Sequence, residues 1–177
     1  MLQSIMRFDP QTLLKLISYF IASSLLAWMV SGCGFSPQTK AMIAYKTIFI
    51  SGSPSRELRD QLTSAIPIFT SATITQNPAL ADIILVIERD EVNSNILAYS
   101  ATGQITAFAL NNLVGFYAYD QEGVSVMTER NIYVVRDMNF TVSTVLAAEI
   151  QQQQMVKDMK AELAMQIVRQ LMALGRR

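Results

Sequence analysis

The sequence contains no histidine, a single cysteine and few charged residues. Without histidine, the chain lacks the commonest general acid or base and the commonest metal ligand. Because Cys33 is the only cysteine, neither an internal disulfide nor a multi-cysteine metal site can form. Only 16% of the 177 residues are charged, and 14 basic residues balance 14 acidic ones. This balance produces no field that attracts nucleic acid, so we expect no nucleic-acid partner.

Motifs of known enzyme classes are also absent. The sequence has no phosphate-binding loop, dinucleotide-binding fingerprint, nucleophile elbow or zinc-protease helix. Acidic pairs occur at Asp90-Glu91 and at Asp120 and Glu122, in contexts typical of turns, and we interpret them as solvated loop charges. We therefore expect no catalytic residues, no metal site and no enzymatic activity.

The hydrophobic residues are concentrated near the N-terminus. Residues 16–30 form an apolar run that follows Arg7 and Lys15 and ends at Ser31-Gly32-Cys33. A membrane-spanning helix needs about 20 apolar residues, and this run is shorter. A basic region, an apolar region and small residues in that order are typical of a secretory signal. We therefore expect residues 1–32 to be an export signal rather than a permanent membrane span.

The end of this run, Val30-Ser31-Gly32-Cys33, resembles the lipobox of bacterial lipoproteins. The resemblance implies a diacylglycerol thioether and an N-acyl chain on Cys33. One acyl chain binds a bilayer only reversibly, whereas two or three make a stable anchor. The alternative is a buried free cysteine at the end of an uncleaved span. Gly34 replaces the aspartate that retains many lipoproteins in the inner membrane, which implies an outer-membrane anchor facing the periplasm.

After a polar tether at residues 33–41, we expect one α+β domain over residues 42–177. β-branched and aromatic composition predicts a strand at 43–50, a second strand is expected at 68–74, and the continuously apolar residues 83–87 predict a strand buried on both faces. Two further strands are expected at 95–119 and 124–135. Ser53-Pro54 predicts the start of an amphipathic helix that ends before Pro67. Within 95–119, Gly103 and Gly115 indicate bends or bulges, and residues 120–123 indicate a hairpin turn. We therefore expect a chain of antiparallel strands.

The last segment has helical periodicity. Apolar residues recur every three or four positions and predict a helix of about thirty residues with one stripe facing a core. The stripe comprises Val142, Val145, Leu146, Ile150, Gln153, Val156, Met159, Leu163, Ile167, Leu171 and Leu174. Such a helix is about 45–50 Å long, longer than packing on a sheet alone requires.

The order of these features resembles the lipopolysaccharide-assembly lipoprotein family, LptE. The shared features are the Cys33-Gly34-Phe35 start, the helix with Ser55-Arg56-Glu57-Leu58, and Gly103-Gln104 at a central strand. The final helix contributes Val145-Leu146-Ala147 and the segment Gln166 to Leu171. Each motif alone is weak, but their order extends over nearly the whole mature chain.

The resemblance implies an α+β fold in which two helices, the C-terminal one long, pack on a four-stranded, mostly antiparallel sheet. It also implies a non-enzymatic role as the plug of an outer-membrane β-barrel, LptD. In this role the protein assists barrel assembly and the delivery of lipopolysaccharide to the outer leaflet. A nearly neutral domain with a polar surface suits a polar barrel lumen, and a lipid anchor raises its concentration there.

The chain departs from its relatives at positions suited to lipid A phosphates. Relatives can carry basic residues where this chain has Ala101 and Ala148, and a common acidic residue is replaced by Gln151. The remaining candidates for lipopolysaccharide binding are basic residues that are more often ordinary surface charges. They are Arg89, Arg130, Arg136 and Lys157.

Two other functions stay open at this point. A lipoprotein of this kind could scaffold or activate a different envelope machine, such as a peptidoglycan synthase. It could also be a periplasmic enzyme, although the sequence offers no chemistry for one.

Overall fold

The computed structural model describes residues 19–21, 40–139 and 145–174, with the side chains of the last segment described from 148 onward. The chain divides into two compact units, Met1–Gln38 and Thr39–Arg177. Within the described residues, no helix has the length and hydropathy needed to cross a membrane. Cys33 and nearly all of the expected signal and tether lie outside the described residues.

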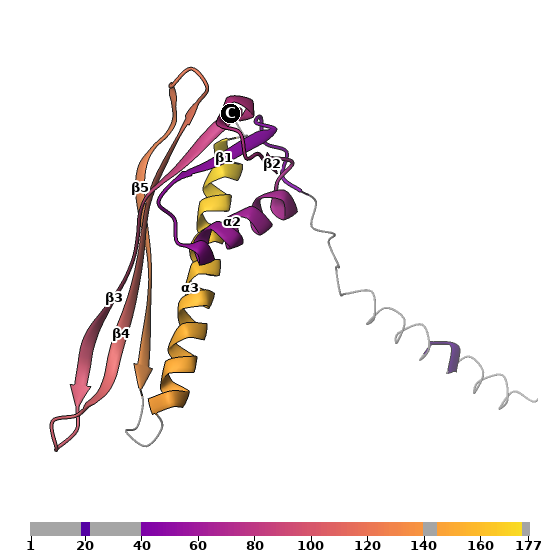
Figure 1. Ribbon diagram of the computed structural model, residues 1–177. Coiled ribbons are helices and arrows are strands. Elements are labelled where there is room, and N and C mark those ends of the chain that lie inside the picture. The colour runs from indigo at the N-terminus through magenta and orange to yellow at the C-terminus, as the bar shows by residue number, and fades with distance from the viewer. Residues whose placement is uncertain (1–18, 22–39, 140–144, 175–177) are drawn as a thin grey trace, which may run out of the picture. The chain divides into compact units, whose positions relative to one another are not determined.

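The described residues of the second unit form five strands, two α-helices and one turn of 3-10 helix (Figure 1). In chain order the elements are β1 (Thr47–Gly52), α2 (Arg56–Phe69), β2 (Thr73–Ile74), η1 (Pro78–Leu80), β3 (Ile83–Tyr99), β4 (Ile105–Asp120), β5 (Ser125–Asn139) and α3 (Val145–Leu174). The α+β class and the long C-terminal helix are confirmed.

The sheet has five strands in the order β2-β1-β3-β4-β5, so the expected count of four is wrong. The fifth strand is the short β2, which lies within the expected strand at 68–74 and pairs with β1 in parallel through only two residues. β1 is also parallel to β3, whereas β3, β4 and β5 form an antiparallel meander. The sheet is therefore mostly antiparallel, as expected.

Helix α2 is displaced from its predicted position. The Ser55 hydroxyl accepts a hydrogen bond from the Leu58 N–H at 3.3 Å, so Ser55, rather than Ser53, caps the helix. The helix continues through Pro67 to Phe69. A proline so close to the C-terminal end removes only one helical hydrogen bond, and the Thr70 N–H still reaches the Ile66 carbonyl at 2.9 Å. The expected strand at 68–74 is thereby reduced to β2.

Strand β3 is much longer than the predicted segment 83–87, because its later residues pair with β4 as far as Tyr99. A turn at 100–104 with Gly103 at φ 79° and a turn at 120–124 with Gly123 at φ 81° join the meander, and both positions were expected. Gly115 lies in β4 beside a shift of register in the pairing with β3, as predicted.

The meander has two halves that differ in their surroundings. In the proximal half, β3 residues 83–90 and the opposite parts of β4 and β5 are covered by α2 and the C-terminal part of α3 (Figure 1). In the distal half, built on β3 residues 91–99, α3 alone approaches the sheet (Figure 1). Most of the core lies in the proximal half and includes Ile48, Leu58, Leu85, Phe116 and Leu163, all fully buried. The buried side chains of Leu110, Val134 and Met138 extend it into the distal half, on β4 and β5.

The apolar stripe of α3 follows the same division. Met159, Leu163, Ile167 and Leu171 are buried, as expected for a stripe that faces a core. Ile150, which belongs to the same stripe, is 62% exposed. The prediction is therefore confirmed from Val156 onward and wrong at Ile150 and Gln153, which are exposed.

Candidate functional site

A polar cluster lies inside the molecule where the two halves of the meander meet. Lys160 of α3 forms an ion pair with Asp90 of β3, and their side chains are 3% and 0% exposed. The Lys160 ammonium also donates to Asn112 Oδ1 at 2.8 Å, and the N–H of Ser55 donates to Asp90 Oδ2 at 2.7 Å. We call Ser55, Asp90, Asn112 and Lys160 the polar node. It connects the cap of α2, two strands and α3.

The register of the strands places the node on the sheet face that packs against α3. Asp90 is opposite Val114, and Asn112 is two residues from Val114 on the same strand, so both side chains point to the same face. On α3, Lys160 follows buried Met159 and precedes Leu163 by one turn. The interpretation of Asp90 as a solvated loop charge is therefore wrong, because the residue lies within a long strand beneath a helix.

The polar node has a structural role, which is to hold elements of the fold in position. A buried ion pair loses hydration on both partners, and further hydrogen bonds must compensate for that loss. Here Asp90 and Lys160 each make one further bond, whereas Asn112 Nδ2 is buried with no hydrogen-bond partner among the described residues. Because three side chains from β3, β4 and α3 meet the backbone N–H of the α2 cap residue Ser55, the node fixes the position of α3 relative to the meander and α2.

The sequence did not predict that the residues of the node come together, although helical periodicity indicated that Lys160 lies close to the core. Lys160 lies four residues after Val156 and three before Leu163, on the border of the apolar stripe. A lysine at that position requires either exposure or a buried partner. Identification of Asp90 as the partner required knowledge that β3 continues past Ile87.

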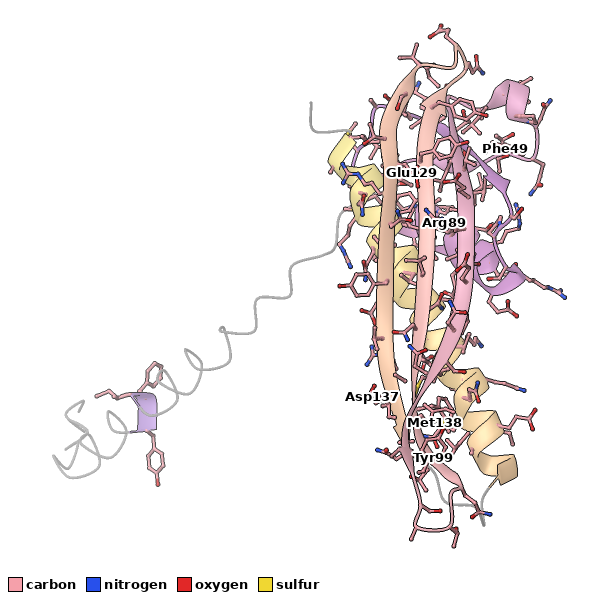
Figure 2. The ribbon with its side chains drawn as sticks, turned by 90° about the vertical axis from the view of Figure 1, so that its left-hand side faces the viewer. Phe49, Arg89, Tyr99, Glu129, Asp137 and Met138 are labelled. Atoms are coloured by element: carbon pink, nitrogen blue, oxygen red, sulfur yellow. The ribbon has the colours of Figure 1, made fainter. Side chains whose placement is uncertain are left out.

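The four basic candidates for lipopolysaccharide binding lie apart from one another. Arg89 is on the outer face of the sheet, away from α3, and pairs with Glu129 at 3.2 Å (Figure 2). Gly115 lies between these residues on β4, and a Cβ there would approach the Arg89 Cβ and Nε to 3.4 Å. The absence of a side chain on Gly115 therefore lets Arg89 reach across β4.

Arg130 and Arg136 lie on the other face of β5 and extend toward α3. Arg130 donates to Gln170 at 3.0 Å, beside a pocket of about 350 Å³ that Arg169 also lines. Arg136 pairs with Glu162 at 2.8 Å. The two arginines are six residues apart, which is about 20 Å of strand, so they belong to separate sites.

The distal half contains the pockets beside the other candidates. A pocket of about 500 Å³ is lined by Arg136 together with Ile150 and Met155 of α3. Lys157 lines a second pocket, of about 440 Å³, on another side of α3 with Glu57 and Glu149. Arg136 thus has apolar neighbours as well as the acidic Glu162 and Asp158, whereas the pocket beside Lys157 contains two glutamates and one apolar residue, Val156.

The positions of Ala101 and Ala148 are at the distal end of the unit, in the turn after β3 and in the first turns of α3 (Figure 1). The β3–β4 turn and the start of α3 therefore lie at the same end of the unit, where this chain has alanines. Gln151 follows on α3 and is exposed.

The outer face of the meander is polar. Its rows of paired residues are Arg89–Gly115–Asn131, Glu91–Leu113–Tyr133, Asn93–Asn111–Val135 and Asn95–Ala109–Asp137. Most members of these rows have amide, charged or phenolic side chains, and Figure 2 views this face. Among the described residues, no group of three potential metal ligands comes together.

The chain is similar to known lipoproteins in sequence profile and in fold. A family profile described as LptE, Lipopolysaccharide-assembly, matches residues 45–171. None of the curated proteins compared with the chain is significantly similar in sequence.

Solved structures with a similar fold come from several bacteria. Lipoprotein B of Nitrosomonas europaea superimposes with a TM-score of 0.67 at 21% identity, over 79% of this chain and 91% of that chain. A minor lipoprotein of Acinetobacter baumannii superimposes with a TM-score of 0.61 at 20% identity, over 74% of this chain and 93% of that chain. The rare lipoprotein B of Shewanella oneidensis superimposes with a TM-score of 0.56 at 22% identity, over 71% of this chain and 93% of that chain.

Proposed function

Because the chain belongs to the LptE lipopolysaccharide-assembly family, we propose that it is the lipoprotein plug of the LptD barrel in the outer membrane. In this role it assists assembly of the barrel and delivery of lipopolysaccharide to the outer leaflet. The observation that carries the proposal is the family match, which extends from Tyr45 to Leu171 and so includes nearly all of the second unit. Membership itself supports a role in lipopolysaccharide assembly and a place in the cell envelope.

The surface chemistry supports a plug. The lumen of a large outer-membrane barrel is polar, and a domain that fills it needs polar side chains on several sides. The outer face of the meander provides asparagine, charged and tyrosine side chains, and exposed glutamines cover part of α3.

We further propose that Cys33 carries the lipid anchor. A diacylglycerol thioether and an N-acyl chain would hold the protein at the periplasmic face of the outer membrane and keep it close to the barrel. Labelled palmitate should enter the wild type and not Cys33→Ala. Persistence of label in the variant would contradict this assignment.

Direct contact with lipopolysaccharide would use basic residues, and Arg136 is the strongest of the four candidates. Its guanidinium adjoins a pocket with apolar Ile150 and Met155, which suits a molecule that joins phosphate groups to acyl chains. Its pairing with Glu162 must loosen to free the charge. Binding of purified lipopolysaccharide should weaken in Arg136→Ala and in Lys157→Ala. Arg89→Ala, on the opposite face, is the control; equal binding by all variants would remove both residues from the site.

The plug itself is tested by copurification and depletion. A tagged protein extracted in detergent should bring down a large β-barrel at one-to-one stoichiometry. Depletion should reduce the correctly assembled barrel and cause lipopolysaccharide defects. Cell-wall defects with a normal barrel would instead indicate the peptidoglycan synthase alternative and overturn the proposal.

A further inference from the structure

The meander has two edges, and both are open in the described part of the chain. β5 has a neighbour on one side only, along its whole length. β3 is paired with β1 only as far as Ile87, because β1 ends at Gly52 and the last backbone hydrogen bond to β3 comes from Ser53. Beyond that point, no described strand pairs with the outer edge of β3, and its backbone groups there can accept another strand.

The two edges differ in how they resist such pairing. Natural edge strands use charges, prolines and bulges to block it. β5 carries Glu129, Arg130, Arg136 and Asp137. The open part of β3 from Val92 to Tyr99 has neither a charged residue nor a proline. Its register with β4 is uninterrupted from Arg89 to Ile96, and the nearest shifts come after Ile96. The β3 edge is therefore regular and unprotected over the segment Val92–Ile96.

Apolar side chains are also exposed along this edge. Val92 is 41% exposed and Ile96 is 48% exposed, on the face toward α3, where they are opposite Asn112 and Phe108 of β4. Here α3 covers β4 and β5 but leaves β3 uncovered (Figure 1). A strand added beside β3 would cover both side chains and use the unpaired backbone groups.

The sequence of the open β3 edge indicates that the strand added beside it comes from a second copy of this chain. Val92-Asn93-Ser94-Asn95-Ile96 reads with the same chemistry in both directions about Ser94. If two such segments pair in antiparallel fashion about a two-fold axis at Ser94, Val92 meets Ile96 on one face and Asn93 meets Asn95 on the other. Each contact occurs twice, apolar with apolar and amide with amide, and no like charges are opposed.

The length of the edge supports the same axis. Ser94 is five residues from Arg89 and five from Tyr99. The open stretch of β3 is bounded by the end of its pairing with β1 at Ile87 and by the turn at 100–104. A second β3 centred on Ser94 therefore fits between the point where β1 departs and the tip of the hairpin.

We propose that the protein forms a homodimer through the distal half of β3, with two copies of Val92–Ile96 paired in antiparallel fashion to make one continuous six-stranded meander. This goes beyond the plug function, because it describes the lipoprotein before or apart from any barrel. It also explains how the exposed Val92 and Ile96 are shielded.

A cross-linking experiment on the full-length protein in detergent tests the axis. Ser94→Cys places two thiols directly opposite each other, with Cβ atoms about 4.5–5.5 Å apart. A short thiol cross-linker should convert this variant to covalent dimer far more than the wild type, which retains Cys33. The matched control is Tyr133→Cys, an exposed position near the middle of β5. Equal cross-linking of both variants, or cross-linking of Ser94→Cys only to another protein, would overturn the proposal.

Sedimentation of the same material tests the pairing itself. The wild type should have the mass of two copies. The double variant Asn93→Lys/Asn95→Lys puts lysines opposite one another in the dimer and should weaken association on the order of tenfold. Both asparagines are exposed in the single copy, so its fold should be unaffected. The control, Tyr133→Lys/Val135→Lys, should remain dimeric. A monomeric wild type, or an unchanged dimer in the Asn93/Asn95 variant, would contradict the proposal.

Discussion

The proximal and distal halves of the meander share the same three strands but use them differently. In the proximal half the strands are packed on one face by two helices, and Leu85, Ile87 and Phe116 are fully buried. In the distal half β3 loses its neighbour β1, and its apolar side chains Val92 and Ile96 are partly exposed. The polar node lies at the boundary. The comparison indicates that the proximal half, where two helices cover the strands, contributes more of the stability than the distal half, where the edge of β3 is open.

The largest expected effect on stability is that of a substitution in the polar node, at the boundary between the two halves of the meander. Lys160→Ala leaves the buried Asp90 carboxylate without its cation and should lower the free energy of unfolding by about 3–5 kcal/mol. Urea unfolding of the variant measures the change. Lys157→Ala, three residues away and exposed, should change it by less than about 0.5 kcal/mol.

A second variant separates the charge from the packing. Lys160→Met with Asp90→Leu removes both charges and should recover more than half of the loss. If Lys160→Ala is as stable as the wild type, the node does not hold the two halves together.

The next effect compares two positions on one helix. Leu163→Ala empties part of the proximal core and should cost about 3 kcal/mol. Ile150→Ala, on the same stripe but exposed in the distal half, should cost less than about 0.5 kcal/mol. Thermal and urea unfolding of the two variants would show whether stability is divided as the burial indicates; equal losses would remove the distinction.

A smaller effect concerns the proximal edge of the sheet. The backbone N–H groups of Lys46 and Thr47 donate to the Asp82 carboxylate at 2.7 and 2.9 Å and hold the pKa of that carboxyl below its ordinary value of 3.8. A lowered pKa in the folded state stabilises the fold above pH 3.8, and this contribution is lost as the pH falls through the folded-state pKa.

Asp82→Asn removes this contribution, which is at most about 1 kcal/mol because the carboxylate is exposed. The difference in unfolding free energy between wild type and variant should be present at pH 7 and shrink below pH 4. A difference that is independent of pH would show that the charge of Asp82 is not what stabilises β1.

The smallest effect concerns the ion pair on the outer face. Arg89 and Glu129 are 45% and 51% exposed, and an exposed pair of this kind contributes about 0–1 kcal/mol. Arg89→Ala should therefore change the unfolding free energy by less than about 0.5 kcal/mol, an effect that 0.5 M salt should reduce further. A loss above 2 kcal/mol would mean that the outer face also contributes to the core stability.

Local sequence patterns predicted the parts of the fold that depend on neighbouring residues. The turns at Gly103 and Gly123, the start of β3 and the buried stripe from Met159 to Leu171 follow from residue type and periodicity. The parts that depend on distant partners were not predicted. The continuation of β3 beyond Ile87 requires pairing with β4, and the expected strand at 68–74 is shortened to β2 because α2 continues to Phe69.

The same distinction applies to the candidate site. The basic residues Arg89, Arg130, Arg136 and Lys157 could be recognised from charge alone, but their separation onto different faces depends on strand register. Asp90 and Lys160 are 70 positions apart, and no short motif connects them. The exposed stripe positions Ile150 and Gln153 of α3 likewise could not be distinguished from the buried ones, since all have the same periodicity.

The separation of Asp90 and Lys160 along the chain has a consequence for folding. β3 and β4 are adjacent in sequence and can pair early, since only a short loop has to close between them. When they do, the Asp90 carboxylate lies on the face that becomes buried, but its cation is near the end of the chain. Stable burial of that face therefore requires α3. We expect the second unit to fold in a single cooperative transition, with no stable intermediate that contains the meander alone.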